Sequence, residues 1–253
     1  MPDRRDRRPV RLHCFAHAGA GVSAFHGWTA SAGPGVEPVP FLLPGRERRR
    51  SEPRITTRDA LLADALPLFS EAGPGPYVLY GHSLGALVAL TLTRALHEAG
   101  MPGPALLAVG ACPPPQAPSP LSDAHDAPDA ELLDILHRMG AVPPGSEREG
   151  IWHRSVLPVL RSDLELAQAL RTAACEPSAA GPLTTPMLIV ASPHDPLAPP
   201  QVTEGWRHWT QGPTRLRVVQ GDHFFVRGTD LPRLLGRACR TVARLDAAPA
   251  LAR

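Results

Sequence analysis

Lysine and asparagine are both missing from the 253 residues of this chain. Without lysine there is no P-loop lysine to hold a phosphate and no amine to form a Schiff base with a carbonyl substrate. Without asparagine there is no acceptor for an N-linked glycan. The strongly basic side chains are therefore all arginine, a composition typical of a GC-rich bacterial genome.

Two further absences narrow the class of protein. The formal net charge is only +2, which argues against nucleic acid as a partner. No apolar run is long enough to cross a membrane, and the charged residues 1–8 lack the apolar core of a signal peptide. We therefore expect a cytoplasmic bacterial protein with no membrane partner.

Cysteine is scarce and scattered, at positions Cys14, Cys112, Cys175 and Cys239. No C-x-x-C pair occurs, so we expect reduced and mostly buried thiols. No group of histidine, cysteine and acidic residues has the spacing of metal ligands. We expect no metal and no cofactor that the chain holds by itself.

The most informative segment of the chain is GHSLG at residues 81–85, which has the pattern G-x-S-x-G. An apolar run precedes it at residues 77–80, and residues rich in helix formers follow it. Strand, sharp turn and helix in this order predict a nucleophile elbow, in which Ser83 stands exposed above the end of a sheet. The glycines are needed because side chains would clash where strand and helix pack this closely.

A serine nucleophile needs a general base and an acid that orients the base, and α/β-hydrolases carry them in the order serine, acid, histidine. Asp195 follows the apolar strand pattern of residues 187–191, so it should lie at the carboxyl end of a strand. His223 follows the last predicted strand, at residues 216–219. We predict Ser83, Asp195 and His223 as the catalytic triad.

Other candidates for these roles fit the pattern less well. His194 and Asp222 are adjacent to Asp195 and His223, and neighbouring side chains on a turn rarely point at one another. His82 lies inside the elbow and should pack or hydrogen-bond locally. Some hydrolases take the acid from the preceding strand, here residues 105–109, but no carboxylate follows that strand.

The tetrahedral intermediate of acyl transfer needs two backbone N–H donors. One is expected from Leu84, the residue after the nucleophile, and the other from the loop that follows an early strand. Residues 11–15 fit that strand and the sequence AHAGAG at 16–21 fits the loop, so we predict Ala18 as the second donor. An ordinary glycine-rich turn is the alternative.

Six segments in order resemble the type II thioesterases, the free-standing editing hydrolases of polyketide and nonribosomal peptide assembly lines. They are CFAHAG at 14–19, LPGRE at 43–47 with Glu52-Pro53 behind it, YGHSLGA at 80–86, LRSDL at 160–164, HDP at 194–196 and GDHFF at 221–225. The family usually has proline at Ala16, glycine at Ala20 and glycine at Asp222. None of these departures removes a catalytic group, although Asp222 places a second carboxylate near the base.

The resemblance implies that Ser83 attacks an acyl thioester on the phosphopantetheine arm of an acyl or peptidyl carrier protein, so that the arm arrives with the partner. A carboxylesterase acting on small esters, or an acyltransferase, would use the same triad. Arg48, Arg49 and Arg50 form a basic loop that could steer an acidic carrier protein and meet its phosphate, or could be only a solvated face. Arg46, in the PGR segment, should make a structural bond.

The order of predicted elements indicates one α/β-hydrolase domain over residues 9–245, with a mostly parallel sheet flanked by helices. Its first half has strands at 11–15, 37–42, 77–80 and 105–109 and helices at 57–70 and 84–98. Helical signals at 129–175, with Ser162 as a helix cap, predict an insertion at 113–180 that acts as a lid or only as structure. We expect residues 1–8 and 246–253 to be disordered and the protein to be a monomer.

Overall fold

The computed structural model describes residues 8–70, 75–141, 150 and 154–248. Its centre is a sheet of six parallel strands in the order β2-β1-β3-β4-β5-β6. The strands are β1 (Val10–Phe15), β2 (Val36–Phe41), β3 (Tyr77–His82), β4 (Leu106–Gly110), β5 (Met187–Ala191) and β6 (Thr214–Val218). A parallel sheet between helices is the predicted α/β class.

The central strands are continuous apolar runs because both of their faces are covered. Every residue of β3 and β5 is buried, whereas exposed residues recur along the edge strand β6. A parallel sheet needs this cover on both sides, since its crossover helices pack on its faces. The sheet therefore separates two apolar clusters, one around Leu79 and Leu90 and the other around Val78 and Leu235.

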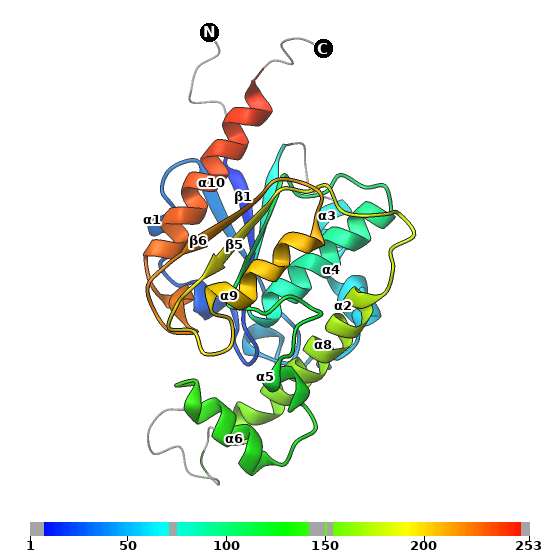
Figure 1. Cartoon of the computed structure of the whole chain (residues 1–253), viewed down its shortest axis with the longest axis vertical. Helices are drawn as coiled ribbons and strands as arrows, with labels where there is room; N and C mark the ends of the chain where they lie inside the picture. The colour runs from blue at the N-terminus through cyan, green and yellow to red at the C-terminus, as the bar shows by residue number, and fades with distance from the viewer. Residues whose placement is uncertain (1–7, 71–74, 142–149, 151–153, 249–253) are drawn as a thin grey trace.

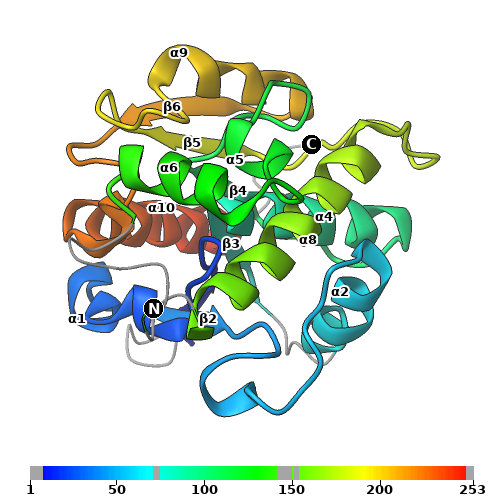
Figure 2. The same ribbon diagram turned by 90° about the horizontal axis from the view of Figure 1, so that it is seen from below.

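Helices form the outer layers of the molecule, as Figure 2 shows. On one side lie α1 (Trp28–Ala32) and α10 (Asp230–Ala247), and on the other lie α2 (Arg58–Ala65), α4 (Leu84–Glu98) and α8 (Leu157–Cys175). Helix α10 buries Leu231, Leu235, Cys239 and Val242, which share one helical face. The short helices α3 (Pro67–Ser70) and α9 (Pro200–Thr203) complete the layers.

The part of the predicted insertion that the structure describes includes α5 (Pro120–Asp123), α6 (Asp129–Arg138) and α8. Figure 1 shows α5 and α6 at the end of the molecule opposite the last turns of α10. They share an apolar cluster with the first half of α8 that includes Leu121, Leu132, Leu136 and Leu160, and Ala18 packs against this cluster. The insertion therefore reaches the predicted oxyanion loop, while its role as a lid stays a prediction.

Parallel strands bring the predicted site residues to one edge of the sheet. Phe15 at the end of β1 pairs with Gly81 of β3, and His82 pairs with Gly110 of β4. Ala191 ends β5 opposite Val218 of β6. The loops that follow β1, β3, β5 and β6 consequently meet at the carboxyl edge, where sites of open α/β sheets lie.

Several sequence-based expectations need correction. The predicted helix at 57–70 is two helices, α2 and α3, and α1, α9 and α10 were not predicted. Ser162 caps no helix, because α8 begins at Leu157 and the Ser162 hydroxyl donates to the carbonyl of Pro158 one turn earlier. Residues 246 and 247 belong to α10 rather than to a disordered tail, whereas 1–7 and 249–253 lie outside the described residues.

Candidate active site

Ser83 occupies the turn between β3 and α4 in a conformation that non-glycine residues rarely adopt, with φ 55° and ψ −119°. Two close approaches explain the flanking glycines. A Cβ on Gly81 would lie 1.9 Å from the carbonyl oxygen of Gly85, and a Cβ on Gly85 would lie 2.0 Å from that of Phe15. The turn is therefore as tight as the G-x-S-x-G pattern predicts. Such strain costs about 1–3 kcal/mol and persists only where the surroundings enforce it.

The structure brings Ser83, His223 and Asp195 together from three different loops. His223 Nε2 lies 3.3 Å from Ser83 Oγ, and His223 Nδ1 lies 3.0 Å from both carboxylate oxygens of Asp195. The amides of Leu197 and Ala198 also donate to Asp195, at 2.9 and 3.2 Å. These bonds fix the carboxylate in place. The carboxylate accepts the proton of His223 Nδ1, so Nε2 can accept from the serine hydroxyl.

The competing residues point elsewhere. His194 is exposed in the turn beside Asp195. Asp222 is also exposed, and its carboxylate accepts from the amide of Phe224 at 2.7 Å instead of meeting the His223 ring. The adjacent side chains of Asp222 and His223 thus have different partners.

His82 has a role that the sequence did not reveal. Its Nε2 lies 2.7 Å from the backbone carbonyl of His223, and its Nδ1 lies 2.7 Å from the hydroxyl of Tyr80. A carbonyl can only accept, so Nε2 carries the proton and Nδ1 accepts from the tyrosine. Burial, followed by the nearby His223, keeps the pKa of His82 well below its usual value. A neutral His82 therefore anchors the backbone of the predicted base to the elbow.

The two predicted oxyanion donors lie in the right segments. Leu84 is the first residue of α4, and the loop that begins after Phe15 passes against Gly85. In the described part of the chain, neither the Leu84 amide nor the Ala18 amide donates a hydrogen bond. Ala18 lines the cavity and Leu84 directly follows Ser83, so their role as donors to a developing oxyanion stays a prediction.

A buried ion pair holds the loop that carries Ala18. Arg46 donates to the carboxylate of Asp163 at 2.7 and 2.5 Å, and the Gly19 amide donates to the same carboxylate at 2.7 Å. Arg46 also donates to the carbonyl of Ala20 at 2.9 Å. The structural bond predicted for Arg46 is confirmed. The sequence did not reveal that Asp163 is its partner, because 117 positions separate the two residues. Asp163 had been singled out only as part of the family-like segment at 160–164.

A cavity of about 400 Å³ opens beside Ser83. The oxyanion loop and His223 line one part of it, and apolar side chains from the insertion line another: Leu121, Leu136, Met139, Val156 and Leu160. An apolar wall next to a serine nucleophile suits an acyl chain.

His17 is the least expected residue of this cavity. Burial, then His223 and Arg227, lower its pKa to about 3. Its ring packs edge-on against His82 at 5.8 Å and Phe224 at 5.2 Å, measured between ring centroids. His17 is therefore neutral at physiological pH and brings no positive charge to the cavity.

The three arginines of the predicted basic loop differ in their surroundings. Arg49 donates to both Asp64 and Glu52, with distances from 2.5 to 3.0 Å, and to the carbonyl of Leu42. Its guanidinium is therefore committed to bonds within the fold, and docking of a partner by Arg49 stays a prediction. Arg48 and Arg50 are exposed and remain candidates for docking.

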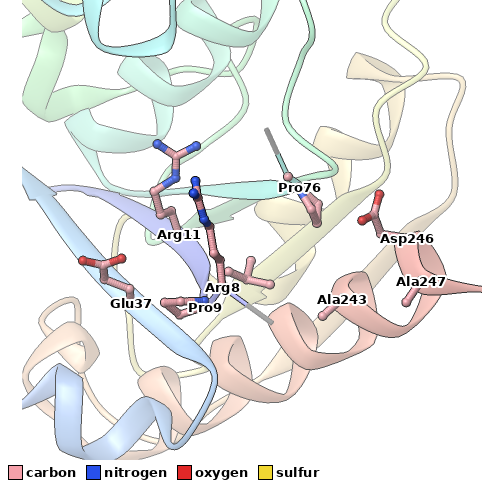
Figure 3. Close-up of a pocket in the computed structure, with 10 residues that line it drawn as sticks. Arg8, Pro9, Arg11, Glu37, Pro76, Ala243, Asp246 and Ala247 are labelled. Atoms are coloured by element: carbon pink, nitrogen blue, oxygen red, sulfur yellow. The ribbon is translucent and has the colours of Figure 1, made fainter. Parts of the chain in front are cut away.

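Figure 3 shows a second hollow, of about 520 Å³. It is bordered by Arg8, Arg11, Glu37, Pro76 and Asp246, at the amino edge of the sheet. A parallel sheet places this edge opposite the carboxyl ends that carry the triad, so the hollow takes no part in the candidate site.

Three of the four cysteines, Cys14, Cys112 and Cys239, are buried, and Cys175 is exposed. All four are free thiols, and burial raises the pKa of Cys112 to about 12. A thiol with so high a pKa is a poor nucleophile at neutral pH. In the described parts of the chain, no three potential metal ligands gather, and no helix is both long and apolar enough to cross a membrane.

The chain is similar in sequence and in fold to known thioesterases. Residues 10–240 match the thioesterase domain family. PikA5, a thioesterase of Streptomyces venezuelae, is 34% identical over 222 residues, which cover 86% of this chain and 75% of PikA5. A probable cadicidin biosynthesis thioesterase of Streptomyces griseus is 33% identical over 86% of this chain, and the match spans 58% of its own length.

Among solved structures, RedJ, a thioesterase from the prodiginine biosynthetic pathway of Streptomyces coelicolor, superposes with a TM-score of 0.77. It is 33% identical, and the match covers 94% of this chain and 89% of RedJ. The fold is thus that of an α/β-hydrolase. The chain belongs to the thioesterase family, and its predicted resemblance to the type II thioesterases of polyketide and nonribosomal peptide pathways is confirmed.

Proposed function

We propose that this thioesterase hydrolyses acyl thioesters from the phosphopantetheine arm of acyl or peptidyl carrier proteins, as an editing enzyme of a polyketide or nonribosomal peptide assembly line. The observation that carries the chemistry is the Ser83–His223–Asp195 geometry, with 3.3 Å between Ser83 Oγ and His223 Nε2. The family match and the similarity to relatives such as PikA5 support a carrier protein as the partner.

In the first half of the reaction, Ser83 Oγ attacks the thioester carbonyl while His223 Nε2 takes the hydroxyl proton. Asp195 stabilises the imidazolium that forms and keeps the ring in place. The amides of Leu84 and Ala18 bind the oxyanion of the tetrahedral intermediate. The C–S bond then breaks, and His223 returns the proton to the departing thiol, so that the acyl group remains on the serine as an ester.

In the second half, water replaces the thiol. His223 takes a proton from the water as it attacks the ester carbonyl, and the same two amides hold the second oxyanion. Collapse of this intermediate releases the carboxylic acid and returns the proton to Ser83 Oγ. No metal or cofactor of the enzyme enters either half, and the phosphopantetheine belongs to the partner.

The test is mass spectrometry of acyl-carrier proteins after incubation with the enzyme. We expect the mass of the acyl group to be lost from the carrier and the free acid to accumulate, while the Ser83→Ala protein leaves the carrier acylated. Matched oxygen esters and an added amine acceptor are tested in parallel. Cleavage of the oxygen esters alone would assign the enzyme to the carboxylesterases, and an acyl-amine product would assign it to the acyltransferases.

A further inference from the structure

Arg227 gives the cavity beside Ser83 a permanent positive charge. It lines that cavity and is exposed. The described residues that line the cavity include no acidic side chain, and Arg227 is the one among them that is charged at every physiological pH. A cavity meant only for a neutral acyl chain would not need a guanidinium.

The exposed guanidinium of Arg227 contacts one aromatic ring of the cavity. Its Cζ lies 4.5 Å from the centroid of the Phe224 ring, a cation–π contact. That ring packs edge-on against His223, with 5.3 Å between centroids. One aromatic ring thus connects Arg227 to the predicted general base, so the position of the guanidinium relative to the reacting atoms is built into the fold.

No carboxylate of the described residues forms an ion pair with Arg227. Other arginines of this protein have such partners, among them Arg46 with Asp163, Arg161 with Asp129 and Arg171 with Asp123. The charge of Arg227 nevertheless affects a neighbouring residue of the cavity. After burial and His223, it is one of the causes that lower the pKa of His17. A positioned charge without a counter-ion can receive an anion from outside.

The walls of the cavity differ in polarity. Ser23, on the 3-10 helix Val22–Phe25, lines the cavity together with Arg227, and this helix packs against the 3-10 helix Phe225–Arg227. The insertion supplies the apolar wall around Leu136 and Leu160. A ligand that fits both walls carries an anionic group as well as an apolar part.

We propose that Arg227, with the Ser23 hydroxyl on the adjoining segment, forms a subsite for an anionic group of the thioester substrate. A guanidinium donates two parallel N–H bonds to a carboxylate or to a phosphate, and the hydroxyl supplies a further donor. The inference rests on the proposed thioesterase function and adds a substrate class to it. The anion is either a carboxylate at the far end of the acyl group or the phosphate of the phosphopantetheine arm.

Two matched pairs of substrates distinguish these sources. Malonyl-pantetheine and propionyl-pantetheine have acyl groups of the same length and differ in the terminal carboxylate. Propionyl-phosphopantetheine and propionyl-pantetheine differ only in the phosphate. The measured quantity is the ratio of kcat/KM within each pair, for the wild-type enzyme, for Arg227→Gln and for Arg215→Gln. Arg215 is an exposed arginine of β6 outside the cavity, so its replacement controls for the change in net charge.

We expect Arg227→Gln to lower one of the two ratios by about 10- to 100-fold, the effect of losing a charge-assisted pair. A fall in the malonyl-to-propionyl ratio assigns the subsite to an acyl carboxylate. A fall in the phosphorylated-to-unphosphorylated ratio assigns it to the arm. Arg215→Gln should leave both ratios at their wild-type values. Two unchanged ratios in Arg227→Gln would overturn the subsite.

A measurement without turnover separates this inference from the proposed function. Malonate and free phosphopantetheine are titrated calorimetrically against Ser83→Ala and against Ser83→Ala/Arg227→Gln. Weaker binding of one of these anions to the double variant supports the subsite even if no thioester is cleaved. Equal affinities, or no binding to either protein, would refute it. Absence of hydrolysis of all the thioesters by the wild-type enzyme would count against the function alone.

Discussion

Asp163 and Arg46 are 117 positions apart in the sequence and form a two-pronged ion pair in the interior, with N–O distances of 2.7 and 2.5 Å. The Asp163 side chain is fully buried and that of Arg46 is 8% exposed. The carboxylate also accepts from the Gly19 amide, the residue after the predicted oxyanion donor. Asp163 of helix α8 and Arg46 of the loop after β2 are thus both hydrogen-bonded to the oxyanion loop.

The first prediction concerns this connection. Asp163→Asn should lower the free energy of unfolding by about 3 kcal/mol, because it leaves the Arg46 guanidinium buried without a counter-charge. It should also lower kcat, since the Gly19 amide loses its charged acceptor and the loop is held less firmly. Urea unfolding and steady-state kinetics measure the two effects.

The double variant Arg46→Met/Asp163→Leu separates stability from catalysis. Removing both charges should restore most of the lost stability, because neither partner is then left unpaired. Activity should remain low, since no carboxylate is present to accept from Gly19. Recovery of kcat together with stability would show that the ion pair matters to the fold and not to the oxyanion loop.

The second prediction concerns the nucleophile. Ser83→Ala should lose about three orders of magnitude or more in kcat for thioester hydrolysis, since it removes the serine hydroxyl that lies within reach of His223. Its thermal unfolding should stay close to that of the wild type, because alanine leaves the packing of Gly81 and Gly85 intact. A folded Ser83→Ala protein with near wild-type activity would end the assignment.

The third prediction concerns the acid. Asp195→Asn should reduce the rate by about 10⁴-fold, since an amide cannot hold the correct tautomer of His223. Asp222→Gly should keep most of the activity, because Asp222 is exposed and, among described contacts, its carboxylate accepts only from the Phe224 amide. The comparison uses the same thioester at one pH. An inactive Asp222→Gly beside an active Asp195→Asn would reverse the choice of carboxylate.

The fourth prediction concerns the arginine loop. Changing Arg48 and Arg50 to Glu should lower kcat/KM for an acyl-carrier protein and much less so for a small acyl thioester, which lacks the carrier's charged surface. The difference should shrink at high salt, because exposed charges are screened.

Arg49→Gln provides the contrast within the same loop. It removes the contacts to Asp64 and Glu52, so it should reduce stability and affect both substrates equally. If Arg48→Glu/Arg50→Glu affects neither substrate, these two arginines are a solvated face and the carrier is recognised elsewhere.

The fifth prediction concerns stability at acid pH. His13 is buried between Phe69 and Tyr77, and burial, then Arg11, lowers its pKa to about 4 from 6.5. The unfolded chain therefore binds a proton between these two values that the folded chain does not. Stability must fall as the pH drops from 6.5 to 4, and His13 contributes about 1.4 kcal/mol per pH unit in this window.

Replacing this histidine tests the assignment. In His13→Leu, the free energy of unfolding from urea titrations at several pH values should fall less steeply between pH 6.5 and 4. The exposed His208 serves as the matched control, and His208→Gln should keep the wild-type slope. Equal slopes in all three proteins would show that His13 is protonated as readily in the fold as outside it.

The segment at residues 81–85 shows what the sequence determined by itself. Its two glycines and the strand and helix around it are local features, and they predicted the elbow and the bounds of α4, Leu84–Glu98. The chain order of serine, acid and histidine then singled out Asp195 and His223. In the structure, the carboxyl ends of parallel strands bring these three residues to one edge. These features were readable because each depends on a few neighbouring residues and on a fixed rule of topology.

Arg49 and Asp163 show what only the tertiary structure decided. Arg49 has the same sequence surroundings as Arg48 and Arg50, but Asp64 lies within its reach once α2 folds back on the loop. The residues next to Asp163 in the sequence do not show that it is buried in an ion pair. Its partners Arg46 and Gly19 come from distant segments of the chain. Electrostatic partners are chosen by proximity in space, and a buried charge is stable only where its partners converge. The sequence therefore predicted the candidate reaction centre, and the fold decided which charged side chains pair with one another around it.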